Sequence, residues 1–261
     1  MGRSARVAIL VVIAIASGVA LFVHAPIPQP DAYHAFGDTR TIGGIPNALN
    51  VLSNIPFFFV GVLGLRFLVN PGAAFESLRE RPAYVLFFAG VLLTAFGSSY
   101  YHWQPTTQRL FWDRFPMAIA FTALFASVIA ERIDVYWSRI LLLPFVFLGV
   151  GSVVAWRISE DQGAGDLRAY VFVQGFPMIA LPLLMAMFRA RYTRSAWLLV
   201  VVLFYVAAKA LEQLDVQIYS ALGGAVSGHS LKHLAAAAAT YAVLEMLKRR
   251  KPLASEVHSA A

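Results

Sequence analysis

Residues 136–156 read YWSRILLLPFVFLGVGSVVAW, and from Ile140 to Trp156 no residue carries a charge. As an α-helix, at about 1.5 Å per residue, such a run covers most of the roughly 30 Å hydrocarbon core of a bilayer. Seven other runs of similar character occur along the chain. The approximate limits of all eight are 7–24, 47–69, 83–102, 110–130, 136–156, 169–188, 195–214 and 229–247. The sequence therefore predicts an all-α, polytopic membrane helix bundle.

The composition supports this class of protein. Of the 261 residues, 59% are hydrophobic and only 13% are charged, whereas a soluble domain is about half apolar and about a quarter charged. The formal net charge is +7, but the basic residues form short clusters between the apolar runs. No basic, aromatic-studded face is evident, so we predict no nucleic-acid partner. The absence of cysteine excludes disulfides, thiolate zinc ligands and cysteine nucleophiles.

The basic clusters predict the orientation in the membrane, because lysine and arginine favour cytoplasmic loops. With the N-terminus inside, 14 of the 21 basic residues face the cytoplasm, and both termini are cytoplasmic. The run 7–24 is either a retained helix or a cleaved signal peptide, and its length favours a retained helix. We predict an N-terminal transmembrane helix (1–25), a seven-transmembrane domain (26–250) and a cytoplasmic tail (251–261). Short loops fit a bacterial inner membrane as well as an organelle, and we favour the former.

The last apolar run begins with His229-Ser-Leu-Lys-His233. Histidines four residues apart on a helix lie on one face, which is a metal-ligand spacing, although it also arises by chance or at a helix cap. His102, at the end of the run 83–102, falls at the same outer end of the bundle in the predicted orientation. Intramembrane ionisable residues are costly and point to function. Three histidines without cysteine favour zinc as the metal cofactor.

Two other polar residues at this end suit the chemistry of hydrolysis. Asp113 can act as general base and acid towards a zinc-activated water, and Ser98, one turn before His102, can donate to a developing oxyanion. Together they predict metal-assisted cleavage of an amide or ester, with the site near the outer leaflet. Two structural alternatives stay open: Ser98 bonds the carbonyl four residues back, or Asp113 pairs with Arg114 or caps its helix.

Two further polar groups belong to the same end. The first is a stripe whose default role is interhelical hydrogen bonding and whose sharper alternative is a bond to a histidine ligand or to Asp113. Its members are Asn50, Ser53 and Asn54. The second is either an ion-pair ladder with i, i+3 spacing or a set of substrate contacts. Its members are Lys209, Glu212 and Asp215.

These motifs resemble, in order and position, those of the CREST superfamily of membrane hydrolases, which includes the alkaline ceramidases and the progestin and adiponectin receptors. The alkaline ceramidase family is the most similar, and the resemblance spans approximately residues 45–247. The stretches that carry it are Asn50-Val-Leu-Ser-Asn54, Gly97-Ser98 before His102, Asp113-Arg-Phe-Pro-Met117 and His229-x3-His233.

The resemblance implies a seven-helix core, to which the first helix is an addition. It implies zinc on His102, His229 and His233, with Ser98 and Asp113 completing the site. The implied reaction is hydrolysis of the amide of ceramide, or of a related amide-linked lipid, to a fatty acid and a sphingoid-type amine. Eukaryotic ceramidases carry an acidic calcium-binding stretch before the core. The matching residues 31–40 contain no glutamate, so we do not predict calcium.

Two other functions remain in view. A receptor or sensor of the progestin and adiponectin receptor type, with a mainly structural metal, is the first alternative, and it predicts ligand affinity without turnover. A proton-coupled carrier is the second, since carriers also hold intramembrane carboxylates and histidines. Those residues usually lie near the midplane of repeated structures, and neither feature is evident here.

Overall fold

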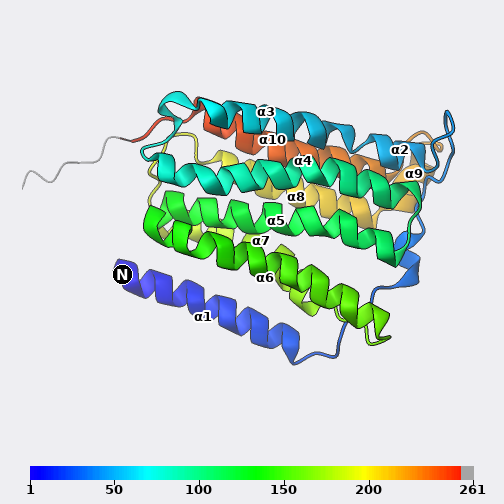
Figure 1. The fold of residues 1–261 in the computed structure, drawn as a ribbon, viewed down its shortest axis with the longest axis horizontal. Coiled ribbons are helices and arrows are strands. Elements are labelled where there is room, and N and C mark those ends of the chain that lie inside the picture. The colour runs from blue at the N-terminus through cyan, green and yellow to red at the C-terminus, as the bar shows by residue number, and fades with distance from the viewer. Residues whose placement is uncertain (254–261) are drawn as a thin grey trace, which may run out of the picture.

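The computed structural model describes residues 1–253, and within that range helices are the only regular secondary structure apart from two isolated bridges. The all-α bundle predicted from the sequence is confirmed (Figure 1). Its helices are α1 (Arg3–Phe22), α2 (Ala48–Leu52), α3 (Ile55–Val69), α4 (Arg81–Trp103), α5 (Thr107–Arg132), α6 (Val135–Asp161), α7 (Arg168–Met187), α8 (Trp197–Gln213), α9 (Asp215–Ala221) and α10 (Gly228–Arg249).

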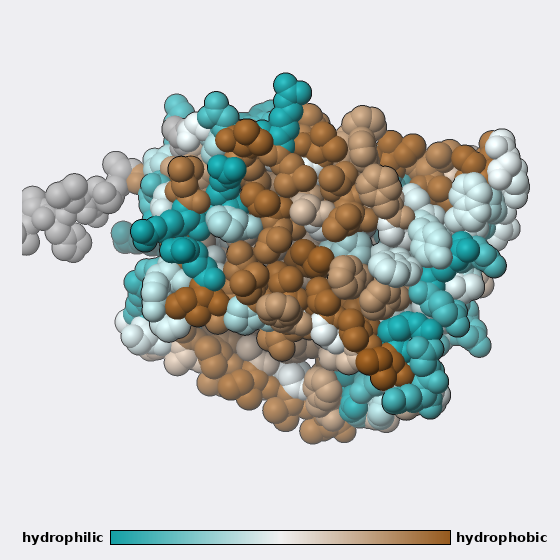
Figure 2. Space-filling model, viewed as in Figure 1, coloured by the Kyte–Doolittle hydropathy of each residue, from teal (hydrophilic) through white to brown (hydrophobic). Residues whose placement is uncertain are grey.

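Six helical segments are long and apolar enough to cross a membrane when α2 and α3 are counted together as Ala48–Val69, and α8 with α9 makes a seventh if the bent pair counts as one span. Helix α10 carries more polar residues, but it runs beside α3 and α8 inside the bundle. Figure 2 shows a hydrophobic band between two hydrophilic ends. The chain is a multi-pass integral membrane protein. Its first residue and the end of its described part lie at the same end of the bundle (Figure 1).

The predicted runs 47–69 and 195–214 are confirmed as the apolar segments Ala48–Val69 and Trp197–Gln213, and the structure adds a break within the first and a bend after the second. The run 47–69 divides into α2 and α3 at Ser53 and Asn54, because Pro56 in the first turn of α3 lacks an N–H and its ring crowds the preceding turn. The run 195–214 ends at Gln213, and α9 follows after a bend of 78°. Asp215 therefore begins a separate helix instead of closing the long one. Most of the predicted tail 251–261 lies outside the described residues.

Close helix contacts at the histidine-bearing end, which we call the histidine end, depend on two glycines. A Cβ atom at Gly97 of α4 would overlap the backbone carbonyl oxygen of Trp112 in α5. A Cβ atom at Gly228 would overlap the carbonyl oxygen of Leu211 and lie 2.8 Å from the Cα of Asp215. Small residues let membrane helices approach this closely. The two glycines set how near α5 lies to α4, and how near α10 lies to the turn between α8 and α9.

The opposite end of the bundle is held by a buried charged group that we call the Arg250 cluster. The Nη1 atom of Arg250 donates to Oε2 of Glu131 and to the hydroxyl of Tyr84, both at 3.1 Å. Its Nε atom donates to the carbonyl of Ala74 at 2.7 Å, and its guanidinium lies 4.0 Å from the ring centroid of Tyr192. The cluster ties the end of α10 to α4 and α5.

Candidate metal centre

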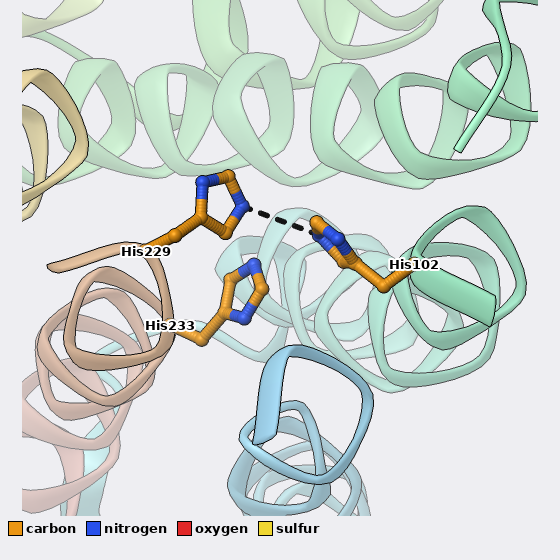
Figure 3. Close-up of side chains that lie close together, drawn as sticks. All are labelled: His102, His229 and His233. Atoms are coloured by element: carbon orange, nitrogen blue, oxygen red, sulfur yellow. Dashed lines mark hydrogen bonds between the residues drawn. The ribbon is translucent and has the colours of Figure 1, made fainter. Parts of the chain in front are cut away.

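Three histidine side chains meet at the histidine end (Figure 3). His102 comes from the last turn of α4, and His229 and His233 come from the first two turns of α10. All three are buried, and one ring nitrogen from each lies within 4.8 Å of the others. The Nε2 atoms of His102 and His229 are 3.3 Å apart, which is about the separation of two nitrogens bound at 2.0–2.1 Å to a tetrahedral zinc. The predicted convergence is confirmed, and the three histidines can hold a metal ion.

The start of α10 is fixed by hydrogen bonds from first-turn backbone N–H groups that have no partner within the helix. Ser227 caps the helix by accepting from the N–H of Ser230 at 3.1 Å. Asp215 accepts from the N–H of His229 at 2.7 Å and from the N–H of Gly37 at 2.8 Å. A carboxylate at a helix N-terminus also interacts favourably with the helix dipole. Asp215 thus holds the backbone of a ligand in place rather than facing substrate.

Ser53 determines which nitrogen of His233 faces the centre. Its Oγ lies 2.8 Å from Nδ1 of His233 and 3.1 Å from the carbonyl oxygen of Asn50. Because the carbonyl takes the hydroxyl hydrogen, Nδ1–H of His233 is the donor to Ser53. The Nε2 atom then keeps its lone pair, as a metal ligand requires. The prediction that the polar stripe bonds to a histidine ligand therefore holds for Ser53.

The other members of the stripe have structural roles. Asn50 donates to the carbonyl of Asp38 at 3.1 Å and accepts from the hydroxyl of Ser230 at 2.8 Å. Asn54 donates to the carbonyl of Asn50 at 2.8 Å. Among the described hydrogen bonds neither amide reaches a histidine ring. Asn50 bonds to Ser230 of α10, as the predicted interhelical role requires, whereas within the described residues Asn54 bonds only to the carbonyls of Asn50 and Val51 in the adjacent α2.

A segment of the loop between α1 and α2 covers the histidines. The ring of Phe36 lies 4.8 Å from the ring of His102 and 4.5 Å from that of His229, measured between centroids. Beside it, Arg40 forms an ion pair with Asp38 at 2.7 Å and donates to the carbonyl of Ala225 at 2.8 Å. The hydrogen bonds from Arg40 lower the pKa of the Asp38 carboxyl. Sequence reasoning missed Phe36, because a single aromatic residue in an irregular loop carries no positional signal.

Lys232 is a second residue that the sequence reasoning did not place. Its Nζ lies 3.0 Å from Nε2 of His229 and 3.0 Å from Oε1 of Glu212. Lys209 also pairs with Glu212, so the predicted i, i+3 pair is present, while Asp215 does not extend it. The signal for Lys232 was its position between the two histidines, one turn after His229. Its ammonium group occupies the lone-pair side of a ligand nitrogen.

One nitrogen of the centre has no protein partner. The Nδ1 atom of His102 is buried and makes no hydrogen bond within the described part of the chain. Buried polar atoms are nearly always satisfied, so this one marks a place for a bound group or an ordered water. The donor set, three imidazoles with no thiolate, suits zinc.

Ser98 lies one turn before His102 in α4, and Asp113 lies in α5, the helix that packs closely on α4 at Gly97. Neither structural alternative for Asp113 applies: α5 begins at Thr107, capped by Thr106, and Arg114 bonds to Gln29 instead of Asp113. Among the described hydrogen bonds, Ser98 does not reach the carbonyl four residues back, although Thr94 does so at 2.8 Å. Both side chains line a cavity.

The cavity has a volume of about 270 Å³ and runs from the centre into the bundle. At its polar end it is lined by Ser98, Asp113, Lys232 and His233, and deeper by Phe87, Leu124 and Val201. Residues 113 and 124 of α5 are about 16 Å apart along the helix, at 1.5 Å per residue. A mostly apolar cavity with polar groups at one end is complementary to a lipid chain.

No family model and no curated protein matches this chain.

Proposed function

We propose that the protein is a zinc-dependent membrane hydrolase that cleaves the amide bond of ceramide or a related amide-linked lipid. The observation that carries the proposal is the meeting of His102, His229 and His233, together with a cavity that His233 lines with Ser98 and Asp113. The resemblance supplies the reaction, and the shape of the cavity supports a lipid substrate. The products are a free fatty acid and a sphingoid-type amine.

The chain's own groups fit the role of zinc ligands. Three neutral imidazoles add no negative charge, and Ser53 keeps Nε2 of His233 unprotonated. When bound there, zinc supplies the Lewis acidity that polarises an amide carbonyl and makes water a nucleophile at neutral pH. The group of side chains that could hold the metal comprises the three histidines and does not include Asp113. Its carboxylate is therefore free for proton transfer.

Asp113 accepts a proton from the attacking water as the water oxygen bonds to the carbonyl carbon. It then delivers that proton to the amide nitrogen as the carbon–nitrogen bond breaks, so that one water is consumed and no net proton is gained or lost. The hydroxyl of Ser98, one turn from His102, stabilises the developing negative charge on the carbonyl oxygen. The apolar depth of the cavity holds the acyl chain while the bond to be cut lies at the polar end.

The location proposed from the sequence has structural support. The N-terminus and the end of the described chain lie at one end of the bundle (Figure 1), and α4 ends and α10 begins, with the histidines, at the other. Most basic residues belong to that end in the predicted topology, and they favour the cytoplasm. We place both termini in the cytoplasm of a bacterial cell and the site near the outer leaflet of its inner membrane.

The decisive experiment replaces one histidine ligand. His229→Ala and His233→Ala are purified beside wild type, with His24→Ala as the control because His24 is exposed. Bound zinc and fatty acid released from a panel of ceramides and other amide lipids are measured. Loss of zinc with a fall in hydrolysis of more than about a hundredfold is expected, beyond the effect of altering a ligand's outer partner. Unchanged zinc and activity would refute the proposal, and ligand binding without turnover in wild type would favour the receptor alternative.

A further inference from the structure

Arg114 is a buried cation whose neighbours in residues 1–253 do not satisfy all of its hydrogen-bond donors. Its residue is only 6% exposed, and its guanidinium carbon lies 4.3 Å from the ring centroid of Trp156, 5.0 Å from that of Tyr170 and 5.5 Å from that of Tyr33. Three aromatic rings around one guanidinium stabilise its charge. They also cover its faces, so its hydrogen bonds run outward in its own plane.

One nitrogen of the Arg114 guanidinium has no hydrogen-bond partner in the described residues. Nη2 donates to Oε1 of Gln29 at 2.6 Å, whereas Nη1 is buried and has no partner in the described residues. None of the ion pairs found in residues 1–253 includes Arg114, although Asp113 precedes it. A buried cation with no carboxylate in ion-pair contact is costly. Since such groups are rare in folded proteins, an external partner is the expected reason for this one.

Arg114 lines the same cavity as the catalytic candidates. The charged residues in that lining are three cations, Arg114, Lys209 and Lys232, and two carboxylates, Asp113 and Glu212, so their formal sum is +1 before any metal is added. Tyr33 contacts both Arg114 and Glu212: its ring lies beside the Arg114 guanidinium, and its hydroxyl donates to Glu212 at 3.2 Å. Burial raises the pKa of the Tyr33 phenol, so it stays a neutral donor. The polar end of the cavity therefore favours an anion.

We infer that Arg114 binds an anionic oxygen of the lipid's polar head, so that among the amide-linked lipids of the proposed function those with a phosphate or carboxylate close to the bond that is cut are preferred over ceramide, whose head is uncharged. The inference rests on the proposed function in that the cavity holds a lipid. Guanidinium groups pair well with carboxylate and phosphate oxygens. The aromatic cage and Gln29 orient Arg114 before the ligand arrives, which lowers the cost of binding.

The test uses the full chain in nanodiscs, with zinc removed by a chelator so that the metal cannot bind the anion. Three probes with one chain length are compared: myristyl phosphate, myristate and myristyl alcohol. Binding is followed by tryptophan fluorescence, because Trp156 packs on Arg114. Wild type is expected to bind at least one anionic probe about tenfold more tightly than the alcohol, the ratio that one charge-assisted hydrogen bond supplies. Whether phosphate or carboxylate gains more identifies the source of the anion.

Arg114→Gln is expected to lose this preference while its affinity for the alcohol stays unchanged. Arg114→Lys keeps the charge and is expected to retain part of the preference for anionic probes. The control is Arg157→Gln, since Arg157 pairs with Asp161 on α6 and does not line the cavity. Zinc content of the reloaded Arg114→Gln protein, equal to wild type, verifies that the centre is intact.

Two results would overturn the inference: equal affinity of wild type for all three probes, or an anion preference that survives in Arg114→Gln. Its failure is separate from that of the hydrolase proposal. In His229→Ala the preference is expected to persist while zinc and hydrolysis are lost. If no amide lipid is cleaved by wild type but the preference holds, the reaction is wrong and the anion site stands.

Discussion

The Oγ atom of Ser53 lies 2.8 Å from Nδ1 of His233, so a residue at the break between α2 and α3 sets the protonation of a histidine in α10. Ser53→Ala removes the acceptor that holds Nδ1–H, and the ring is then free to turn or change tautomer. We expect zinc affinity to fall about 10- to 100-fold, measured by competition with a zinc chelator. Ser152→Ala is the control, since Ser152 bonds only its own helix, at Gly149. Equal losses in both variants would exclude a specific role for Ser53.

Lys232 opposes the metal that its neighbours are arranged to hold. Its Nζ lies 3.0 Å from Nε2 of His229. At an effective dielectric constant of 20, a unit charge and a doubly charged ion about 4 Å apart interact by about 8 kcal/mol. Glu212 offsets most of this repulsion. If about an eighth remains, Lys232→Met raises zinc affinity about fivefold. Lys209→Met is the matched control, because Lys209 contacts Glu212 without contacting a histidine. Weaker zinc binding in Lys232→Met would show that the ammonium supports the centre.

Gly97 controls the distance between Ser98 and Asp113. A methyl group there would overlap the carbonyl oxygen of Trp112, and overpacking of this kind costs about 1–3 kcal/mol. Gly97→Ala is expected to lower the thermal midpoint and reduce hydrolysis by more than the lost stability explains, because it moves α4 from α5. Gly151→Ala, also in a helix but with nothing near its Cβ position, should change neither. A normal rate in Gly97→Ala would show that the site does not depend on this spacing.

The Arg250 cluster predicts a large effect far from the centre. Glu131→Ala leaves the guanidinium of Arg250 buried without its carboxylate, a change that costs about 3–5 kcal/mol. The expected result is a marked fall in thermal midpoint, with the zinc stoichiometry of the folded protein unchanged. Asp161→Ala breaks the more exposed pair with Arg157 and should have little effect. Similar stability of the two variants would contradict the role assigned to the cluster.

Much of the fold was accessible from the sequence because a bilayer imposes strong rules. Apolar runs of sufficient length define helices, and the alternation of their directions places His102 at the same end as His229 and His233. The break at Ser53 and the bend into α9 after Gln213 escaped prediction, because an apolar run does not reveal where its backbone bends.

The contacts made by loops were not predictable in the same way. Residues 23–47 have no helical periodicity, so their path over the centre, with Phe36 on the histidines and Gln29 on Arg114, follows only from tertiary packing. The i, i+4 spacing identified the ligands. It could not show that Lys232 turns towards His229, or that Asp215 binds the N-terminus of the helix that carries His229.

Acid should release the loop that covers the centre. Hydrogen bonds from Arg40 lower the pKa of Asp38 in the folded protein. The pair therefore stabilises the fold fully above the unfolded pKa of about 3.9, and this contribution is lost as the pH falls through the lower, folded value. Asp38→Asn lacks it at every pH. We expect the difference in thermal midpoint between wild type and Asp38→Asn to be constant above about pH 5 and to shrink below about pH 4. Asp161→Asn, with a more exposed carboxylate, controls for general charge effects, and a gap that widens on acidification would reverse the assigned sign.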